Sequence, residues 1–150
     1  MKNYFRIFQY IVPAIRLPFQ IQSMKRKLNR TSVEDIITEI FRIGTTHLTV
    51  SSIPVLTRKF TNYYQLCNFY VITIMHSKNS CLLRSLLLFT WCVRCNLSVT
   101  VHIGVQRNQS AIMGHAWIEF NQISFREPET TKSYTTMLTY DFDGREFSPV

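Results

Sequence analysis

The hydrophobic pattern of this chain changes its period at Asn96, and that change limits the folds open to it. Before Asn96 apolar residues recur at helical spacing, and after it they alternate with polar residues, as in strands that bury one face. We therefore expect helices followed by an antiparallel β-meander, which is the α+β class. The expected helices are 31–44, 56–75 and 81–95, and the expected strands are 97–105, 112–120, 122–125 and 134–140.

Residues 1–30 differ from the rest and are interpreted as a basic N-terminal arm. Apolar and basic positions alternate there, and Pro13 and Pro18 are expected to divide the arm into short pieces that pack on the domain. The domain is predicted to occupy residues 31–150, with a frayed tail from Asp141 onward. Thr31 or Ser32 can serve as the N-cap of its first helix.

The formal net charge is +8, and residues 1–30 hold seven basic residues and no acid. Such a segment suits an acidic partner, a nucleic acid or a membrane surface, or is a solvated helix face. No nucleic-acid recognition fold accompanies the charge, so nucleic acid is not an expected partner. No apolar run has the length of a membrane-spanning helix, and the N-terminus lacks the pattern of a signal peptide.

The four cysteines are Cys67, Cys81, Cys92 and Cys95. Cys92-x-x-Cys95 has the spacing of a redox or zinc pair, but the second pair that zinc needs is missing. Both residues fall on the buried side of an apolar helix, so we interpret them as structural thiols. Free thiols in a chain without a signal peptide indicate the reducing cytoplasm.

Cys81 and His115 form the most informative pair of residues in the chain. Cys81 opens the expected helix 81–95, where free N–H groups and a partial positive charge make a thiol easier to ionise. The same N–H groups can hold the oxyanion of an acyl-transfer intermediate. His115 lies near the start of the expected strand 112–120, between two small residues that leave room for a substrate chain. A cysteine nucleophile needs such a base, and an acid that orients it.

Two glutamates are candidates for that acid. Glu119 lies on the same strand as His115 but well displaced along it. Glu127 is expected on the next antiparallel strand, from which its side chain can return to His115. Glu127 is therefore the preferred third member.

Four further residues have candidate roles, each with a structural alternative. Asn79 and Ser80 either cap the helix, which is favoured, or donate to the oxyanion. Arg84 either forms a structural ion pair or contacts substrate. Trp117 is either a core residue or a wall of the cleft. His102 is expected to be exposed on the polar face of its strand.

Three ordered motifs resemble those of one enzyme family. They are Cys81-Leu82-Leu83-Arg84-Ser85-Leu86, Ile103-Gly104-Val105 and His115-Ala116-Trp117-Ile118-Glu119. Over about residues 55–130 the chain resembles the transglutaminase-like cysteine proteases of lasso peptide biosynthesis, which implies a papain-like, transglutaminase-type core. The Cys and His of that family correspond to Cys81 and His115. Its third member is an Asp at the position of Glu127, a departure because the extra methylene of Glu changes the geometry.

The resemblance implies a function in antibiotic biosynthesis. These thiol proteases remove the leader from a ribosomally made precursor peptide (a RiPP), and an ATP-dependent cyclase of the asparagine-synthetase type then closes the ring. Some members carry a fused winged-helix domain that binds the leader. Only about fifty residues precede the matched region, so the resemblance implies a stand-alone protease that needs a separate leader-binding protein. The basic arm is a candidate contact for that protein, the cyclase or the leader.

Two alternatives stay open. An acyltransferase or amidase with the same three residues differs only in the acceptor, and a non-catalytic partner that stabilises the cyclase needs none of them. The thiol chemistry requires no metal or organic cofactor, and His47 and His76 have no sequence partners for a metal site.

Overall fold

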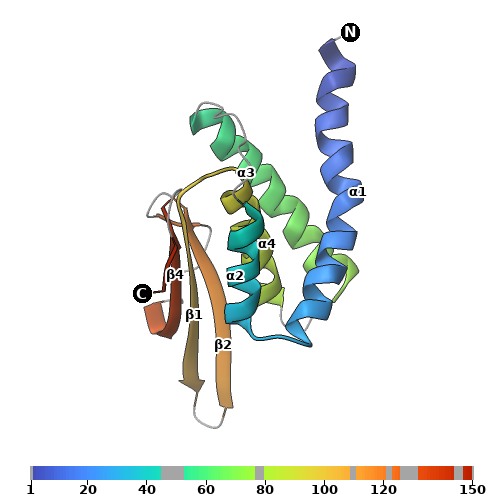
Figure 1. The fold of residues 1–150 in the computed structure, drawn as a ribbon. Coiled ribbons are helices and arrows are strands. Elements are labelled where there is room, and N and C mark those ends of the chain that lie inside the picture. The colour runs from blue at the N-terminus through green and yellow to red at the C-terminus, as the bar shows by residue number, and fades with distance from the viewer. Residues whose placement is uncertain are drawn as a thin grey trace.

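The fold, taken from a computed structural model, is described for residues 2–44, 53–76, 80–108, 111–120, 123–125, 132–143 and 147–149. The helices are α1 (Lys2–Leu28), α2 (Val33–Gly44), α3 (Ile53–Asn68) and α4 (Ser80–Arg94), and a π-helical turn, η1 (Phe69–Ile74), extends α3. The strands are β1 (Val99–Asn108), β2 (Ala111–Phe120), β3 (Ile123–Ser124), β4 (Thr135–Phe142) and β5 (Phe147–Pro149). The helices precede the strands and gather on one side of the sheet (Figure 1), which confirms the α+β class.

Within the described residues the sheet has five antiparallel strands in the order β3-β2-β1-β4-β5. β1, β2 and β3 form the expected meander, whereas β4 returns to the other edge of β1. The prediction of a frayed tail from Asp141 is wrong in part, because Asp141 and Phe142 complete β4 and β5 pairs with them. Phe142 is buried and meets Phe41 edge-on at 5.1 Å, and this packing holds the end of β4 on the core.

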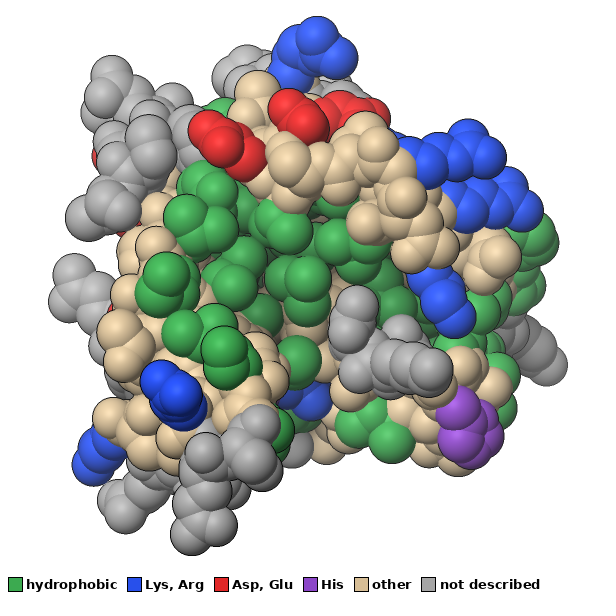
Figure 2. Space-filling view, turned by 90° about the horizontal axis from the view of Figure 1, so that it is seen from below, with side chains coloured by type: hydrophobic (Ala, Val, Ile, Leu, Met, Phe, Trp, Pro, Cys, Tyr) green, Lys and Arg blue, Asp and Glu red, His purple; other side chains and the backbone are tan. Residues whose placement is uncertain are grey.

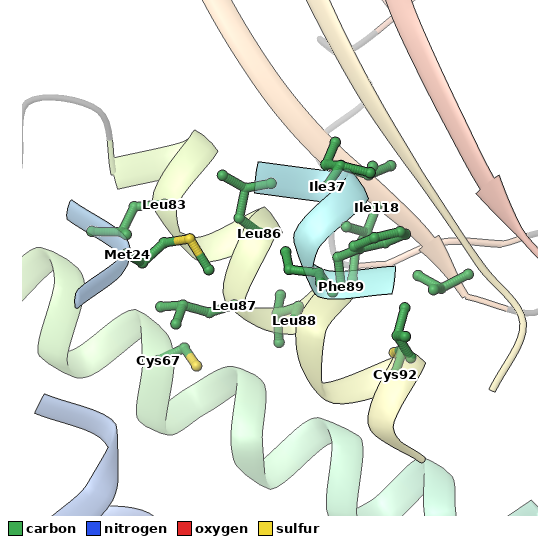
Figure 3. Packing of buried hydrophobic residues seen from close by; sticks show 14 of the residues in the cluster. Met24, Ile37, Cys67, Leu83, Leu86, Leu87, Leu88, Phe89, Cys92 and Ile118 are labelled. Atoms are coloured by element: carbon green, nitrogen blue, oxygen red, sulfur yellow. The ribbon is translucent and has the colours of Figure 1, made fainter. Parts of the chain in front are cut away.

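Helix α4 lies at the centre of the core, as its nearly all-round apolar surface predicts. Its buried side chains include Leu83, Leu86, Leu87, Leu88, Phe89, Cys92 and Val93. Figure 3 shows those from Leu83 to Phe89, and Cys92, together with Met24 of α1, Ile37 of α2, Cys67 of α3 and Ile118 of β2. Helices α1, α2 and α3 and the strands β1 and β2 therefore all pack against α4.

Helix α1 runs without a break through Pro13 and Pro18, so the prediction that these prolines divide the arm is wrong. An interior proline costs about 3 kcal/mol. Burial of Leu17, Ile21 and Met24 in the core offsets this cost, since each such side chain contributes roughly 1.5–3 kcal/mol. Of the helices in the described ranges, α1 included, none combines the length and the apolarity needed to cross a membrane.

Helix α2 begins at a capping box, and its N-cap is one of the two residues that the sequence predicts for that role. The Asp35 N–H donates to Ser32 Oγ at 3.1 Å, and the Ser32 N–H donates to Asp35 Oδ2 at 3.4 Å. Ser32, not Thr31, is therefore the N-cap, and Asp35 takes the reciprocal position.

Helix α4 ends in a tight left-handed turn that leads directly into the sheet. Asn96 has a φ of 54°, its N–H donates to the Val93 carbonyl, and the Leu97 N–H donates to the Cys92 carbonyl, both at 3.0 Å. This is a Schellman motif. Only residues 95–98 separate α4 from β1, so the two elements run antiparallel.

The close approach of β4 and Trp117 to Gly104 gives a test of the sheet register. A Cβ at Gly104 would lie 2.9 Å from the Thr135 carbonyl oxygen and 3.1 Å from the Trp117 ring. We expect Gly104→Ala to lower the free energy of unfolding by about 1–3 kcal/mol, the usual cost of overpacking. Urea denaturation followed by circular dichroism measures the change.

Gly114→Ala on the neighbouring strand is the matched control. A Cβ there meets no described atom within 4 Å, so the free energy of unfolding should change by less than about 0.5 kcal/mol. Equal destabilisation by the two substitutions would contradict the register.

Candidate active site

Cys81 lies in the first turn of α4, as the sequence predicts. Its side chain is half-buried and its thiol is free. The first backbone N–H groups of a helix have no partner within it, and they point past the start of the helix together with the positive end of its dipole. Ser80 begins the helix beside Cys81 and is also half-buried. Asn79, the other capping or oxyanion candidate, lies outside the described residues.

A buried hydrogen bond joins the start of α4 to β2. Ser85 Oγ donates to the Ala116 carbonyl oxygen at 2.9 Å. Ser85 lies one helical turn after Cys81 and therefore on the same side of α4. Ala116 directly follows His115. The bond thus connects the two segments that carry the predicted thiol and imidazole.

The bond reaches β2 at its open edge. The Phe125 N–H donates to the Ile118 carbonyl from the β3 side, and carbonyls two residues apart on a strand point the same way. The Ala116 carbonyl therefore points to that same edge. Within the described residues β3 pairs only with Glu119 and Phe120, so the start of α4 occupies the edge that β3 leaves uncovered.

Helix α4 and β2 run in the same direction, because β1 is antiparallel to both (Figure 1). One helical turn back from Ser85 to Cys81 is about 5.4 Å, and a strand rises about 3.3 Å per residue. Moving the same distance back along β2 from Ala116 reaches roughly Gly114 and His115. By this estimate Cys81 and the backbone of His115 lie at about the same level along β2, and the strand alternation puts the His115 side chain on the face of β2 opposite the core residue Ile118.

His115 contacts two aromatic rings. Its imidazole stacks on Trp117 with ring centroids 5.9 Å apart, and Tyr134 lies 5.3 Å away on the approach to β4. Trp117 is buried, and its ring packs against the His115 imidazole. The sequence alone did not single out Tyr134, because its position depends on β4 pairing with the far edge of β1.

His102 is not exposed, contrary to the sequence prediction. It pairs across the strands with Trp117, and the two rings stack at 5.2 Å. The His102 Nδ1 lies 3.2 Å from Thr139 Oγ1, and Nε2 lies 3.5 Å from a carboxylate oxygen of Glu119. The indole of Trp117 covers His102, although the alternation of apolar and polar residues along β1 predicts that His102 faces solvent. Glu119, the less favoured acid, therefore contacts His102, while Glu127 falls outside the described residues and its role stays a prediction.

Arg84 connects α4 to α3. Its guanidinium donates to Asn68 Oδ1 at 3.0 Å and lies 5.5 Å from the centre of the Tyr64 ring. These contacts supply a structural role through an amide and an aromatic face. Contact between Arg84 and a substrate stays a prediction.

An apolar ledge extends the helix-facing side of the sheet beyond the start of α4. It consists of Ile103, Val105, Ile112 and Leu138, which the strand register places on the same face as the core residue Ile118. Ile112 and Leu138 are exposed. Figure 2, seen from below, shows hydrophobic side chains gathered across this end of the molecule. The ledge and the open space beside Gly114 form an exposed apolar surface on the face of the sheet opposite the His115 side chain.

The other cysteines have environments unlike that of Cys81. Burial raises the pKa of Cys67 to about 12 and that of Cys92 well above its usual value, and it raises the pKa of Cys95 more modestly. Cys92 is fully buried, which fits its interpretation as a structural thiol, whereas Cys95 follows the end of α4 and is half-buried. In the ranges described, no three His, Cys, Asp or Glu residues are grouped as metal ligands.

These environments predict an order of thiol alkylation. In the native protein iodoacetamide should modify Cys81 first and Cys95 more slowly, because burial reduces the thiolate population of Cys95. Cys67 and Cys92 should react only after denaturation. Peptide mass mapping over time measures the order, and native labelling of Cys92 as fast as that of Cys81 would contradict it.

Comparison with known proteins identifies the family of the chain. The model of the transglutaminase-like superfamily matches residues 57–139, which are more than half of the chain and include both Cys81 and His115. No curated protein and no solved structure matches the chain. Members of this superfamily are typically cysteine-based enzymes. The match over more than half of the chain shows that it belongs to the transglutaminase-like superfamily.

Proposed function

We propose that this protein is a cysteine protease that removes the leader from a ribosomally synthesised lasso peptide precursor. The observation that carries the proposal is the placement of Cys81 in the first turn of α4, held through Ser85 against β2 at the level of His115. The three sequence motifs that resemble the leader peptidases of lasso peptide biosynthesis support this substrate in particular.

In the proposed reaction the Cys81 thiolate attacks the carbonyl carbon of the bond between leader and core. His115 accepts the thiol proton and then delivers it to the leaving amine, which departs as the free core peptide. The N–H groups at the start of α4, with Ser80 and Asn79 as further candidates, hold the oxyanion. Water then hydrolyses the leader thioester and releases the Cys81 thiol. Glu127 orients the imidazole throughout.

The surroundings of the site support a peptide substrate. The apolar ledge offers an exposed hydrophobic surface on the sheet, and Gly114 leaves the strand beside His115 without a side chain. The His115 imidazole contacts the rings of Trp117 and Tyr134. A chain with apolar side chains next to the cleaved bond fits this arrangement best.

The proposal includes partners in the cytoplasm. A separate leader-binding protein presents the precursor, and an asparagine-synthetase-like cyclase consumes the released amino terminus. The exposed basic residues of α1, among them Arg16 and Arg26, supply a surface for an acidic partner. A gene cluster with a short precursor, a cyclase and a small leader-binding protein would agree with this assignment.

Cys81→Ala tests the catalytic proposal. With precursor and leader-binding protein from such a cluster, mass spectrometry should show leader removal by the native protein. The substitution should reduce the rate at least about a thousandfold, because it removes the nucleophile. Cys95→Ala, which changes a half-buried thiol outside the site, should retain the rate within about threefold.

The product masses separate the proposal from its alternatives. Free leader carboxylate indicates hydrolysis, whereas a leader joined to an added amine indicates an acyltransferase. Leader removal that persists in Cys81→Ala would show that Cys81 is not the nucleophile. A native protein that stabilises the cyclase but cleaves nothing would indicate a non-catalytic partner.

The two glutamates give a paired test of the acid. Glu127→Gln should lower kcat by about 10²–10⁴-fold, because a neutral amide no longer stabilises the imidazolium that forms in the reaction. Glu119→Gln should leave kcat within about threefold, because the Glu119 carboxylate lies beside His102. If kcat falls more in Glu119→Gln than in Glu127→Gln, the assignment of Glu127 as the acid is wrong. The pair of His102 and Glu119 would then be the candidate for that role.

A further inference from the structure

A cavity of about 330 Å³ lies among the four helices, away from Cys81. Its walls include Arg16 and Met24 of α1, Ile40 of α2, Tyr63 of α3, and Trp91 and Arg94 of α4. At 1.5 Å per residue, Trp91 and Arg94 lie roughly 15–20 Å along α4 from Cys81. The cavity is therefore separate from the candidate active site.

Helical spacing explains why these side chains converge. On α4, Leu87, Trp91 and Arg94 lie on one face, and on α1 the residues from Arg16 to Lys27 that line the cavity also recur every three or four positions. Met24 and Ile40 are buried and form an apolar floor.

The aromatic wall of the cavity is fixed by its own contacts. The Trp91 ring stacks on Tyr63 at 5.8 Å. The Tyr63 hydroxyl donates to Gln20 Oε1 at 3.3 Å, which connects α3 to α1. The cavity is thus largely preformed, as ligand sites usually are.

The charge of the cavity is unbalanced. Three of its lining residues are basic, Arg16, Lys27 and Arg94, and one is acidic, Glu39. Lys27 and Glu39 form an ion pair with each other. In the part of the chain that the structure describes, neither Arg16 nor Arg94 has a carboxylate or hydrogen-bond partner. Burial raises the pKa of Tyr63 well above its usual value, so its hydroxyl adds no negative charge.

We propose that this cavity binds an organic anion, a carboxylate joined to an aromatic or branched aliphatic group. Arg16 and Arg94 hold the carboxylate, for which the planar guanidinium is well shaped. Trp91, Ile40 and Met24 cover the apolar group. The volume lies at the lower end of the range for small-molecule sites, which suits one such group. The carboxylate comes either from a free acid or from an acidic side chain of a peptide.

Isothermal titration calorimetry on the intact chain tests the proposal with 1-naphthoate as the probe. We expect saturable binding, and at least about tenfold weaker binding of the neutral isostere 1-naphthamide. Arg16→Gln and Arg94→Gln should each weaken naphthoate binding about tenfold or more. Arg94→Lys, which keeps the charge and loses the planar fork, should give a smaller loss.

Arg58→Gln is the matched control, because Arg58 is an exposed arginine of α3 outside the cavity. It should leave naphthoate binding unchanged, and thermal melts should show all four variants folded. Naphthamide binding as tight as naphthoate, a loss in Arg58→Gln equal to that in Arg94→Gln, or no saturation would overturn the proposal.

A second titration distinguishes the two sources of the carboxylate. The probe is an N-acetyl dipeptide amide with glutamate followed by leucine. Binding tighter than that of naphthoate, and sensitive to Arg94→Gln, assigns the site to an acidic peptide. Weaker binding assigns it to a free acid. All of these measurements can be repeated in Cys81→Ala, so they do not depend on the proposed protease activity.

Discussion

The hydrogen bond from Ser85 to the Ala116 carbonyl is the contact on which the geometry of the candidate site depends. Ser85 is the polar residue among the buried side chains of α4, which are otherwise apolar. An apolar residue there would suit the core equally well but would leave a buried carbonyl without a donor, at a cost of about 1–3 kcal/mol. Apolar packing alone tolerates small shifts of α4 along the sheet, whereas this directional bond fixes its position relative to β2. The spatial relation between Cys81 and His115 follows from that position.

The sequence predicts those structural features that depend on interactions between residues close together in the chain. The bounds of α4, the Ser32 cap and the alternation of β1 and β2 all follow from local patterns, and they place Cys81 at a helix start and His115 on a strand. The surroundings of His115 depend on pairings between distant segments. The return of β4 to β1 brings Tyr134 to the imidazole, and the register of β1 on β2 places His102 under Trp117. Alternation gives no information about which edge a later strand joins, so both contacts were missed.

In helix α1, packing against the rest of the protein overrides the local rule that proline interrupts a helix. Two prolines argue against a continuous helix, yet Leu17, Ile21 and Met24 recur at helical spacing and enter the core with α4. Tertiary burial outweighs the lost backbone bonds. The same docking forms one wall of the cavity lined by Arg16 and Arg94. If residues 1–30 formed short separate pieces, this wall would be absent. Among the described residues, the cavity is the one site to which α1 contributes.

The short turn from α4 into β1 has a consequence for folding. Cys81 and His115 lie on consecutive elements, α4, β1 and β2, that are joined by a Schellman turn and a hairpin. Contacts between neighbours in sequence need little loop closure and form fast. The thiol and the imidazole therefore belong to a unit that can assemble before α1 docks and before β4 closes on the far edge. Sequence changes in α1 or β4 can therefore alter what the protein binds, while the positions of the proposed nucleophile Cys81 and the proposed base His115 relative to each other stay the same.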